Sequence, residues 1–190
     1  DFIFPSKLSK YVDTDKQLMQ QGREYGIRRL MSINLLKRLE IRGVETYTIT
    51  SHVGLGNFKP VDVEDLSKHK VDSEQIFISQ QVADAVQQAH ENAKRVCVVG
   101  TEVMRALEHV VGTNGDIKAY DGWTNKFIYA PYDFTVANAF LVNFYMPMST
   151  QLIMVATYGG YEAVMKAYKE AVKEGYRFGD YGDAMLILND

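Results

Sequence analysis

The sequence predicts an α/β protein with a mixed, partly parallel sheet flanked by helices. Runs rich in β-branched and apolar residues alternate with amphipathic stretches long enough for helices, and this alternation is typical of a sheet packed against helices. The run at 95–99 is almost wholly apolar, as strands buried on both faces of a parallel sheet are. Apolar residues make up 46% of the 190 residues, which is enough for one well-packed core.

The amino-terminal 31 residues and the rest of the chain differ in how clearly their apolar residues recur at helix or strand spacing. Residues 1–31 show no clear periodicity and are expected to form an amino-terminal segment, whereas residues 32–190 are expected to form the α/β domain. The chain opens at Asp1, without an initiator methionine or a signal sequence, so a fragment or a processed chain is expected.

Helices are predicted wherever apolar side chains recur every three or four residues. Ser32 fits the N-cap of the first helix and Gly43 its carboxyl end, and three leucines between them share one face. Ser149 fits the N-cap of a later, short apolar helix. The ranges expected to be helical are 32–43, 81–93, 103–111, 149–160 and 161–175.

Strands are predicted at runs dense in β-branched, aromatic or apolar residues. Residues 44–50 consist largely of Val, Thr, Tyr and Ile, which favour strands over helices. Two shorter candidates flank Pro131. The ranges expected to be strands are 44–50, 76–78, 95–99, 127–129, 134–136 and 184–188.

The charge and the cysteine content narrow the class of protein. A net charge of -3 excludes a protein that is basic all over, although nucleic-acid binding needs only a local basic patch. Cys97 is the single cysteine, expected to be buried, and without an internal disulfide the chain fits a reducing compartment such as the cytoplasm. No apolar stretch approaches the ~20 residues that cross a bilayer, so no membrane association is expected. The oligomeric state is left open.

Basic residues accumulate between positions 23 and 42 and allow two interpretations. They are Arg23, Arg28, Arg29, Lys37, Arg38 and Arg42. Such a cluster is either the solvated face of a helix, which is the commoner case, or a surface that contacts phosphates.

Two glycine-containing turns follow predicted strands, and ligands of open α/β sheets bind beyond the carboxyl ends of strands. The first turn spans 51–58, where Gly54 and Gly56 let the backbone bend and His52 supplies a group that titrates near neutrality. A purely structural turn is at least as consistent with this pattern as a ligand-binding loop.

The second turn, Gly100-Thr101, joins a predicted strand to a helix. Main-chain N–H groups at such a junction attract anions, but Thr101 is equally consistent with a simple N-cap. Arg105 and Glu108 follow one turn apart on the same helix and are expected to pair with each other.

No metal site and no nucleophile are expected. The four histidines lack the spacing of metal ligands, and Cys97 lies within a strand with no base nearby in sequence. Neither a dinucleotide-binding Gly-x-Gly-x-x-Gly nor a Gly-Lys-Ser/Thr phosphate loop is present. These patterns alone indicate an α/β domain with a ligand crevice.

A series of ordered blocks resembles the S-adenosylmethionine:tRNA ribosyltransferase-isomerases of queuosine biosynthesis. The first reads His-Val-Gly-Leu-Gly-Asn-Phe-Lys-Pro-Val at 52–61, and Val-Glu-Asp-Leu-Ser-Lys-His-Lys follows at 63–70. The further matches are Ser73-Glu74, Val99-Gly100-Thr101 with Arg105 and Glu108, Gly122-Trp123-Thr124, Phe127-Ile128, Pro131-Tyr132, Phe134, Asn143-Phe144, Met146-Pro147, Ser149-Thr150, Tyr176-Arg177-Phe178 and Tyr181-Gly182-Asp183-Ala184-Met185. The likeness covers roughly residues 32–190 and is more specific than any single motif.

The resemblance implies a fold and a reaction. Members of this family combine an α/β domain with a β-barrel domain from the amino-terminal half, so this chain is expected to be the carboxyl-terminal part of the α/β domain and to lack the barrel. They move and isomerise the ribosyl part of S-adenosylmethionine onto the aminomethyl group of a 7-deazaguanine base in tRNA. Adenine and methionine leave, and epoxyqueuosine results. S-adenosylmethionine and a precursor tRNA are therefore the expected substrates.

The resemblance also implies catalytic positions. A sulfonium acidifies its neighbouring C–H bonds, so the reaction needs a general base within hydrogen-bonding reach. His52 is the first candidate for this base and Glu74 the second. Arg105, the third expected catalytic residue, is placed with the Gly100-Thr101 turn to hold a carboxylate or ribose hydroxyls, and Trp123 or Tyr132 to stack on a base. The residues expected to bind S-adenosylmethionine are Gly54, Gly56, Phe58, Gly100, Thr101, Asn143, Tyr181 and Asp183.

The chain departs from the family's pattern at three points. Leu30 and Tyr145 stand where the family has histidine, and the Gly100-Thr101 turn is one residue short. Neither leucine nor tyrosine can replace imidazole as a base near pH 7. The alternative expectation is therefore a truncated or degenerate, catalytically inactive relative that serves as a ligand- or RNA-binding module.

Overall fold

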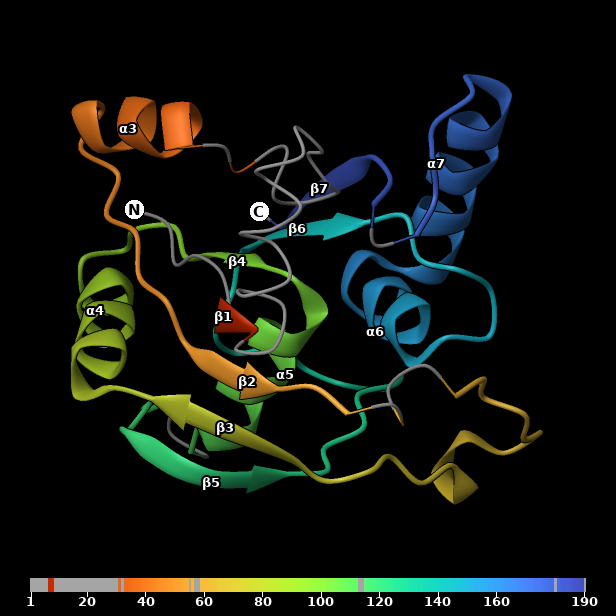
Figure 1. The fold of residues 1–190 in the computed structure, drawn as a ribbon, viewed down its shortest axis with the longest axis horizontal. Coiled ribbons are helices and arrows are strands. Elements are labelled where there is room, and N and C mark those ends of the chain that lie inside the picture. The colour runs from red at the N-terminus through yellow and green to blue at the C-terminus, as the bar shows by residue number, and fades with distance from the viewer. Residues whose placement is uncertain are drawn as a thin grey trace.

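The computed structural model shows two small sheets with helices packed around them (Figure 1). It describes residues 7–8, 31, 33–54, 56, 59–112, 115–179 and 181–189. The expected boundary after residue 31 falls largely outside these ranges and stays a prediction. No helix within the described ranges is long and apolar enough to span a membrane.

The first sheet, sheet A, holds four strands in the order β1-β2-β3-β5. They are β1 (Lys7–Leu8), β2 (Thr50–His52), β3 (Glu74–Ile78) and β5 (Tyr120–Thr124). β1 runs parallel to β2, and the other neighbouring pairs are antiparallel. Along β3, Ile76 and Ile78 are buried while Phe77 between them is exposed. Because successive side chains point to opposite faces, sheet A has one buried and one solvent-exposed face.

The second sheet, sheet B, holds three strands in the order β4-β6-β7. They are β4 (Cys97–Val99), β6 (Ala139–Asn143) and β7 (Ala184–Leu188). β4 runs parallel to β6, and β6 runs antiparallel to β7. Every residue of β4 is buried, including the free thiol of Cys97, as its apolar run predicted. The mixed, partly parallel α/β class is confirmed, with the strands divided between two sheets.

Five α-helices and a short 3-10 helix are described around the sheets. They are α3 (Ile33–Ile41), η2 (Leu66–Lys68), α4 (Gln80–Glu91), α5 (Thr101–Val110), α6 (Thr150–Gly159) and α7 (Tyr161–Lys173). The hydroxyl of Ser149 accepts from the Leu152 N–H at 3.1 Å, which confirms the predicted cap of α6. In Figure 1, α3 and α4 lie on one side of the molecule and α6 and α7 on the other.

α5 differs from the other helices because seven of its ten residues are buried. A helix that is buried nearly all round must find internal partners for its polar side chains, since water does not reach them. Arg105 and Glu108 are both buried on this helix. The partners of these two residues organise much of the surrounding structure.

Three predicted strands are wrong, and three described strands, β1, β5 and β6, were not foreseen. Residues 44–49, 127–129 and 134–136 pair with no described strand. At 134–136 the reason is visible: the N–H groups of Thr135 and Val136 donate to the carboxylate of Glu108, at 3.0 and 2.9 Å, instead of to a neighbouring strand. Amino-acid composition shows which segments could form a strand. It does not show which acceptors the N–H groups of such a segment will bind in the folded protein.

A single large core joins the two sheets through aromatic and aliphatic side chains. Phe140 on β6 is fully buried and meets the ring of Tyr158 on α6 edge to face, with ring centroids 5.2 Å apart. A smaller cluster lies on the opposite face of sheet B, where the leucines of α3 pack against Val99 and Leu141. The predicted apolar face of this helix is thereby confirmed.

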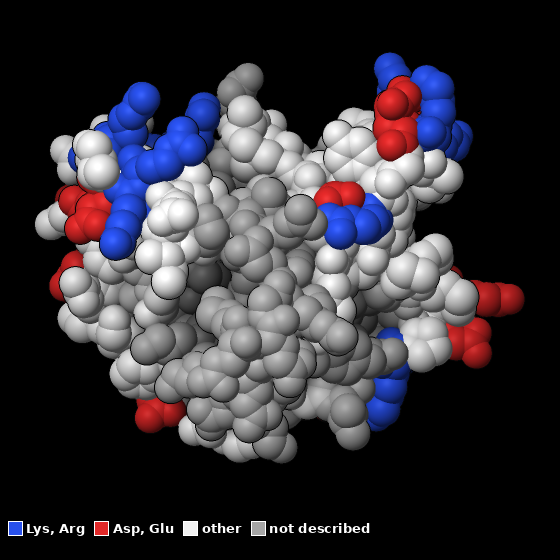
Figure 2. All heavy atoms as spheres, turned by 45° about the horizontal axis from the view of Figure 1, so that its top comes forward, with Lys and Arg blue, Asp and Glu red and all other residues white. Residues whose placement is uncertain are grey.

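The basic side chains of α3 lie on the surface. Figure 2 shows Lys and Arg gathered over this helix, with acidic side chains close by. Lys37, Arg38 and Arg42 are exposed there, as is Glu40. Arg23, Arg28 and Arg29 lie outside the described residues. An exposed basic helix face of this kind fits either a solvated surface or a surface that contacts phosphates.

Replacing Phe140 with alanine is expected to lower the free energy of unfolding by about 3–5 kcal/mol, because it leaves a cavity in the core. The same replacement of Phe77, which is 48% exposed on sheet A, should cost about 1 kcal/mol or less. Urea unfolding followed by circular dichroism measures both. Equal losses in the two variants would contradict the placement of the core.

Candidate functional site

Three strands of sheet A end together beside α5. His52, the last residue of β2, pairs with Gln75, and Glu74, the first residue of β3, pairs with Thr124, the last residue of β5. The segments that leave this end of the sheet are the loop after His52, the stretch before Glu74 and the stretch after Thr124. Positions far apart in the sequence are therefore brought to one place.

Glu74 and Arg105 form a buried ion pair at this end of sheet A. Arg105 Nη2 donates to Glu74 Oε2, and the side chains are only 6% and 3% exposed. The N–H of Gly54 donates to the other oxygen, Oε1, at 2.9 Å. Burial lowers the pKa of Arg105 to about 10, which leaves the guanidinium charged at neutral pH. Three of the expected site residues are thus in direct contact.

The expected pairing of Arg105 with Glu108 is wrong. Glu108 accepts from the N–H groups of Thr135 and Val136 and from the hydroxyl of Tyr132, the last at 2.9 Å. Arg105 and Glu108 lie one turn apart on the same buried helix, but they do not pair with each other. Each forms its hydrogen bonds with a segment from another part of the fold. Burial together with the Glu108 charge raises the pKa of Tyr132.

The Gly100-Thr101 turn lies at the carboxyl ends of two parallel strands, β4 and β6. Gly100 has a φ of 91°, a left-handed conformation that favours glycine, and its N–H donates to Leu141 O at 3.0 Å. Gly100, not Thr101, occupies the N-cap position of α5, so the N-cap interpretation of Thr101 is wrong. The Thr101 hydroxyl instead donates to the phenol oxygen of Tyr145 at 3.3 Å.

A shallow pocket, partly open to solvent, lies where α5 and α6 begin. Its polar lining comes from Thr101, Glu102, Arg105, Lys126, Thr150 and Gln151, and its apolar lining from Val71, Phe127, Ile128 and Met154. Thr101 and Arg105 were expected at the site. Together with the Glu74 carboxylate behind Arg105, they make this pocket the strongest candidate for a ligand site.

Lys126 and Tyr145 are site residues that the sequence did not identify as such. Lys126 lies directly after β5, and its Nζ donates to the main-chain oxygen of Glu108 at 2.7 Å. Tyr145 is buried, and its N–H donates to the hydroxyl of Tyr168 at 2.9 Å. Both residues stand inside or beside the blocks that resemble the family. This position was the signal for Lys126, whereas Tyr145 was noted because it stands where the family has histidine.

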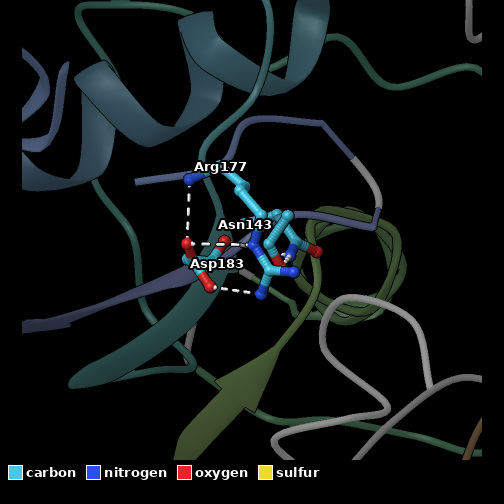
Figure 3. Close-up of polar contacts among 4 residues, drawn as sticks. Asn143, Arg177 and Asp183 are labelled. Carbon is cyan, nitrogen blue, oxygen red and sulfur yellow. Dashed lines mark hydrogen bonds and ion pairs between the residues drawn. The ribbon is translucent and has the colours of Figure 1, made fainter. Parts of the chain in front are cut away.

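A second group of expected residues lies at the carboxyl end of β6 (Figure 3). Asn143 Nδ2 donates to the main-chain oxygen of Asp183 at 3.1 Å. The Asp183 carboxylate accepts from the N–H of Arg177 at 2.8 Å and from its Nη2 at 2.9 Å. A Cβ on Gly182 would lie 2.3 Å from Arg177 O, so the turn requires glycine there. Tyr181 is exposed on this turn.

The remaining expected residues are placed differently from Glu74. His52 is exposed and pairs with Gln75, so strand alternation puts its side chain on the solvent face of sheet A, opposite to that of Glu74. Gly56 follows in the loop, and its carbonyl accepts from the Lys59 N–H at 3.1 Å. Phe58 and Leu30 lie outside the described residues. The described residues include no group of three His, Cys, Asp or Glu placed to hold a metal ion.

The chain is similar to known proteins over most of its length. The profile of the queuosine biosynthesis protein family matches residues 29–187. An S-adenosylmethionine:tRNA ribosyltransferase-isomerase of Bacteroides fragilis is 60% identical over 158 residues, and one of Phocaeicola vulgatus is 56% identical over 158 residues. Each match covers 83% of this chain and 45% of the relative, so the chain spans less than half the length of these relatives.

A solved structure agrees with the sequence comparison. The crystal structure of an S-adenosylmethionine tRNA ribosyltransferase from Thermotoga maritima matches with a TM-score of 0.68 and 33% sequence identity, over 83% of this chain and 50% of that one. Fold and sequence thus agree over the same large share of the chain, and the chain belongs to the queuosine biosynthesis protein family.

Proposed function

We propose that this chain supplies the carboxyl-terminal part of a tRNA ribosyltransferase-isomerase site. The reaction moves the ribosyl part of S-adenosylmethionine onto a 7-aminomethyl-7-deazaguanine base in tRNA and gives epoxyqueuosine, with loss of adenine and methionine. The names of the Bacteroides and Phocaeicola relatives support this assignment. A tRNA substrate implies a cytoplasmic site of action.

The observation that carries the proposal is the contact of Gly54, Glu74 and Arg105 beside the pocket. These residues come from three of the family-like blocks, separated by 20 and 31 positions, yet both oxygens of one buried carboxylate join them. A buried charge pair of this kind is costly to build into a core, and such pairs are common at functional sites. The Thr101 and Arg105 side chains then line the pocket itself.

Two residues compete for the role of general base in the proposed reaction. Glu74 already accepts from Arg105 and Gly54, so both of its carboxylate oxygens are occupied. His52 is exposed at the end of β2, two residues before Gly54. An exposed imidazole is accessible to a large substrate such as tRNA, so His52 is proposed as the base and Glu74 as the residue that positions Arg105.

The tRNA would contact the chain through its phosphates. Lys37, Arg38 and Arg42 on and beside α3 offer an exposed basic surface despite the net charge of -3. Local cationic surfaces of this kind supply most of the sequence-independent affinity for nucleic acids.

A second candidate function is a binding module without catalysis. The buried Tyr145 favours it, because this residue stands where the family has histidine and its hydroxyl is engaged by Thr101. Such a module would keep affinity for S-adenosylmethionine or RNA and would release no adenine.

Turnover is tested by adenine release from S-adenosylmethionine in the presence of precursor-modified tRNA, with calorimetry for binding. The wild-type chain is expected to bind S-adenosylmethionine and to release adenine, and the His52→Ala variant to keep binding but lose about 100-fold or more in rate. Gln75→Ala, the cross-strand neighbour of His52, is the control and should stay active. Binding without release would favour the module, and absence of both would refute the proposed function.

Replacing Glu74 with glutamine is expected to lower the free energy of unfolding by about 3–5 kcal/mol, because Arg105 keeps a buried charge without its partner. Glu170→Gln removes the exposed partner of Lys173 and should cost about 1 kcal/mol or less. Urea unfolding of both variants measures the difference. A loss for Glu74→Gln no larger than that for Glu170→Gln would show that the buried pair carries no such constraint.

A further inference from the structure

The pocket beside Arg105 carries two charges that the proposed base chemistry does not use. Lys126 lines it from the segment after β5, and Glu102 lines it from the first turn of α5. Val71, Ile128 and Met154 form an apolar wall of the same pocket. One small space therefore offers a cation, an anion and a hydrocarbon surface together.

The Lys126 side chain has more N–H donors than its hydrogen bonds in the described structure use. Its Nζ has three N–H donors, and one of them is used by the Glu108 main-chain oxygen at 2.7 Å. The Nζ lies 5.0 Å from the ring centroid of Tyr132. Among the described residues no carboxylate forms an ion pair with it, since the Glu108 carboxylate is taken up by the 132–136 segment.

The surroundings of Lys126 favour an anionic ligand. Burial lowers the pKa of this lysine, and the Glu108 charge only partly offsets the effect. A carboxylate brought to Nζ would stabilise the ammonium form by a charge-assisted hydrogen bond. Arg105, the other cation of the pocket, already has the Glu74 carboxylate, so Lys126 is the better anchor for an incoming anion.

The size and the polarity of the pocket select one part of a ligand. The pocket is shallow and partly open to solvent, so it cannot enclose a whole drug-sized ligand. It therefore suits the end of a larger molecule. An amino-acid end has a carboxylate for Lys126, an ammonium for Glu102 and methylene groups for the apolar wall.

We propose that this pocket binds the amino-acid end of S-adenosylmethionine, with the α-carboxylate on Lys126 and the α-ammonium facing Glu102. The inference rests on the proposed function for the identity of the ligand and adds which part of it the pocket recognises. Bound in this way, the sulfonium end of the ligand extends out of the pocket, and Arg105 links the pocket to the Glu74 carboxylate.

Calorimetry on the 190-residue chain tests the inference with two ligands, S-adenosylmethionine and its decarboxylated analogue. The Lys126→Met variant is expected to bind S-adenosylmethionine about tenfold or more weakly than the wild type. Its affinity for the decarboxylated analogue should match that of the wild type within about twofold, which also shows that the variant is folded. Lys118→Met, the same change at an exposed lysine, is the control and should leave both affinities unchanged.

The outcomes separate this inference from the proposed function. Unchanged binding of S-adenosylmethionine to Lys126→Met, or an equal loss for both ligands, overturns the contact between Lys126 and the carboxylate while the proposed function stands. If the wild-type chain binds neither small ligand, the proposed function fails and the inference fails with it.

Discussion

The ion pair between Glu74 and Arg105 is the contact on which the arrangement of the site depends. Either charge alone would be prohibitively costly at this depth, so each side chain fixes the position of the other. Because Glu74 begins β3 and Arg105 lies in the middle of α5, the pair ties the end of sheet A to the central helix. The main chain at Gly54 is held by the same carboxylate, so the loop after β2 joins this contact as well.

The two groups of site residues lie in adjacent parts of the fold. Thr101 follows β4 and Asn143 ends β6, and these strands are parallel neighbours whose carboxyl ends lie side by side. Tyr145 lies between the groups: its hydroxyl accepts from Thr101, and its main chain continues directly from Asn143. A ligand that reaches both groups would thus lie across the carboxyl ends of sheet B, the place where open α/β sheets commonly bind ligands.

Much of the fold follows from sequence pattern, and the site follows only in part. The helices and the buried β4 were predictable because helical spacing and a continuous apolar run are local signals. The ion pair was not, because nothing local distinguishes Glu74 from Glu108 as the partner of Arg105; the choice depends on which segment folds back onto α5. The strands β5 and β6 were missed for a similar reason, since their pairing is set by distant neighbours. The family resemblance supplied the positions of Glu74 and Arg105 but not their contact.

The Glu108 side chain fixes the backbone of residues 135–136 mainly through main-chain N–H groups. It accepts from two main-chain N–H groups, which every residue except proline possesses, and from one tyrosine hydroxyl. The path of the backbone at 135–136 is therefore fixed by Glu108, while Val136 and Phe134 place their own side chains in or against the core. The backbone at 135–136 is thus anchored by a helix position about 27 residues away, so the loss of the Glu108 carboxylate would leave two buried or half-buried N–H groups without their acceptor.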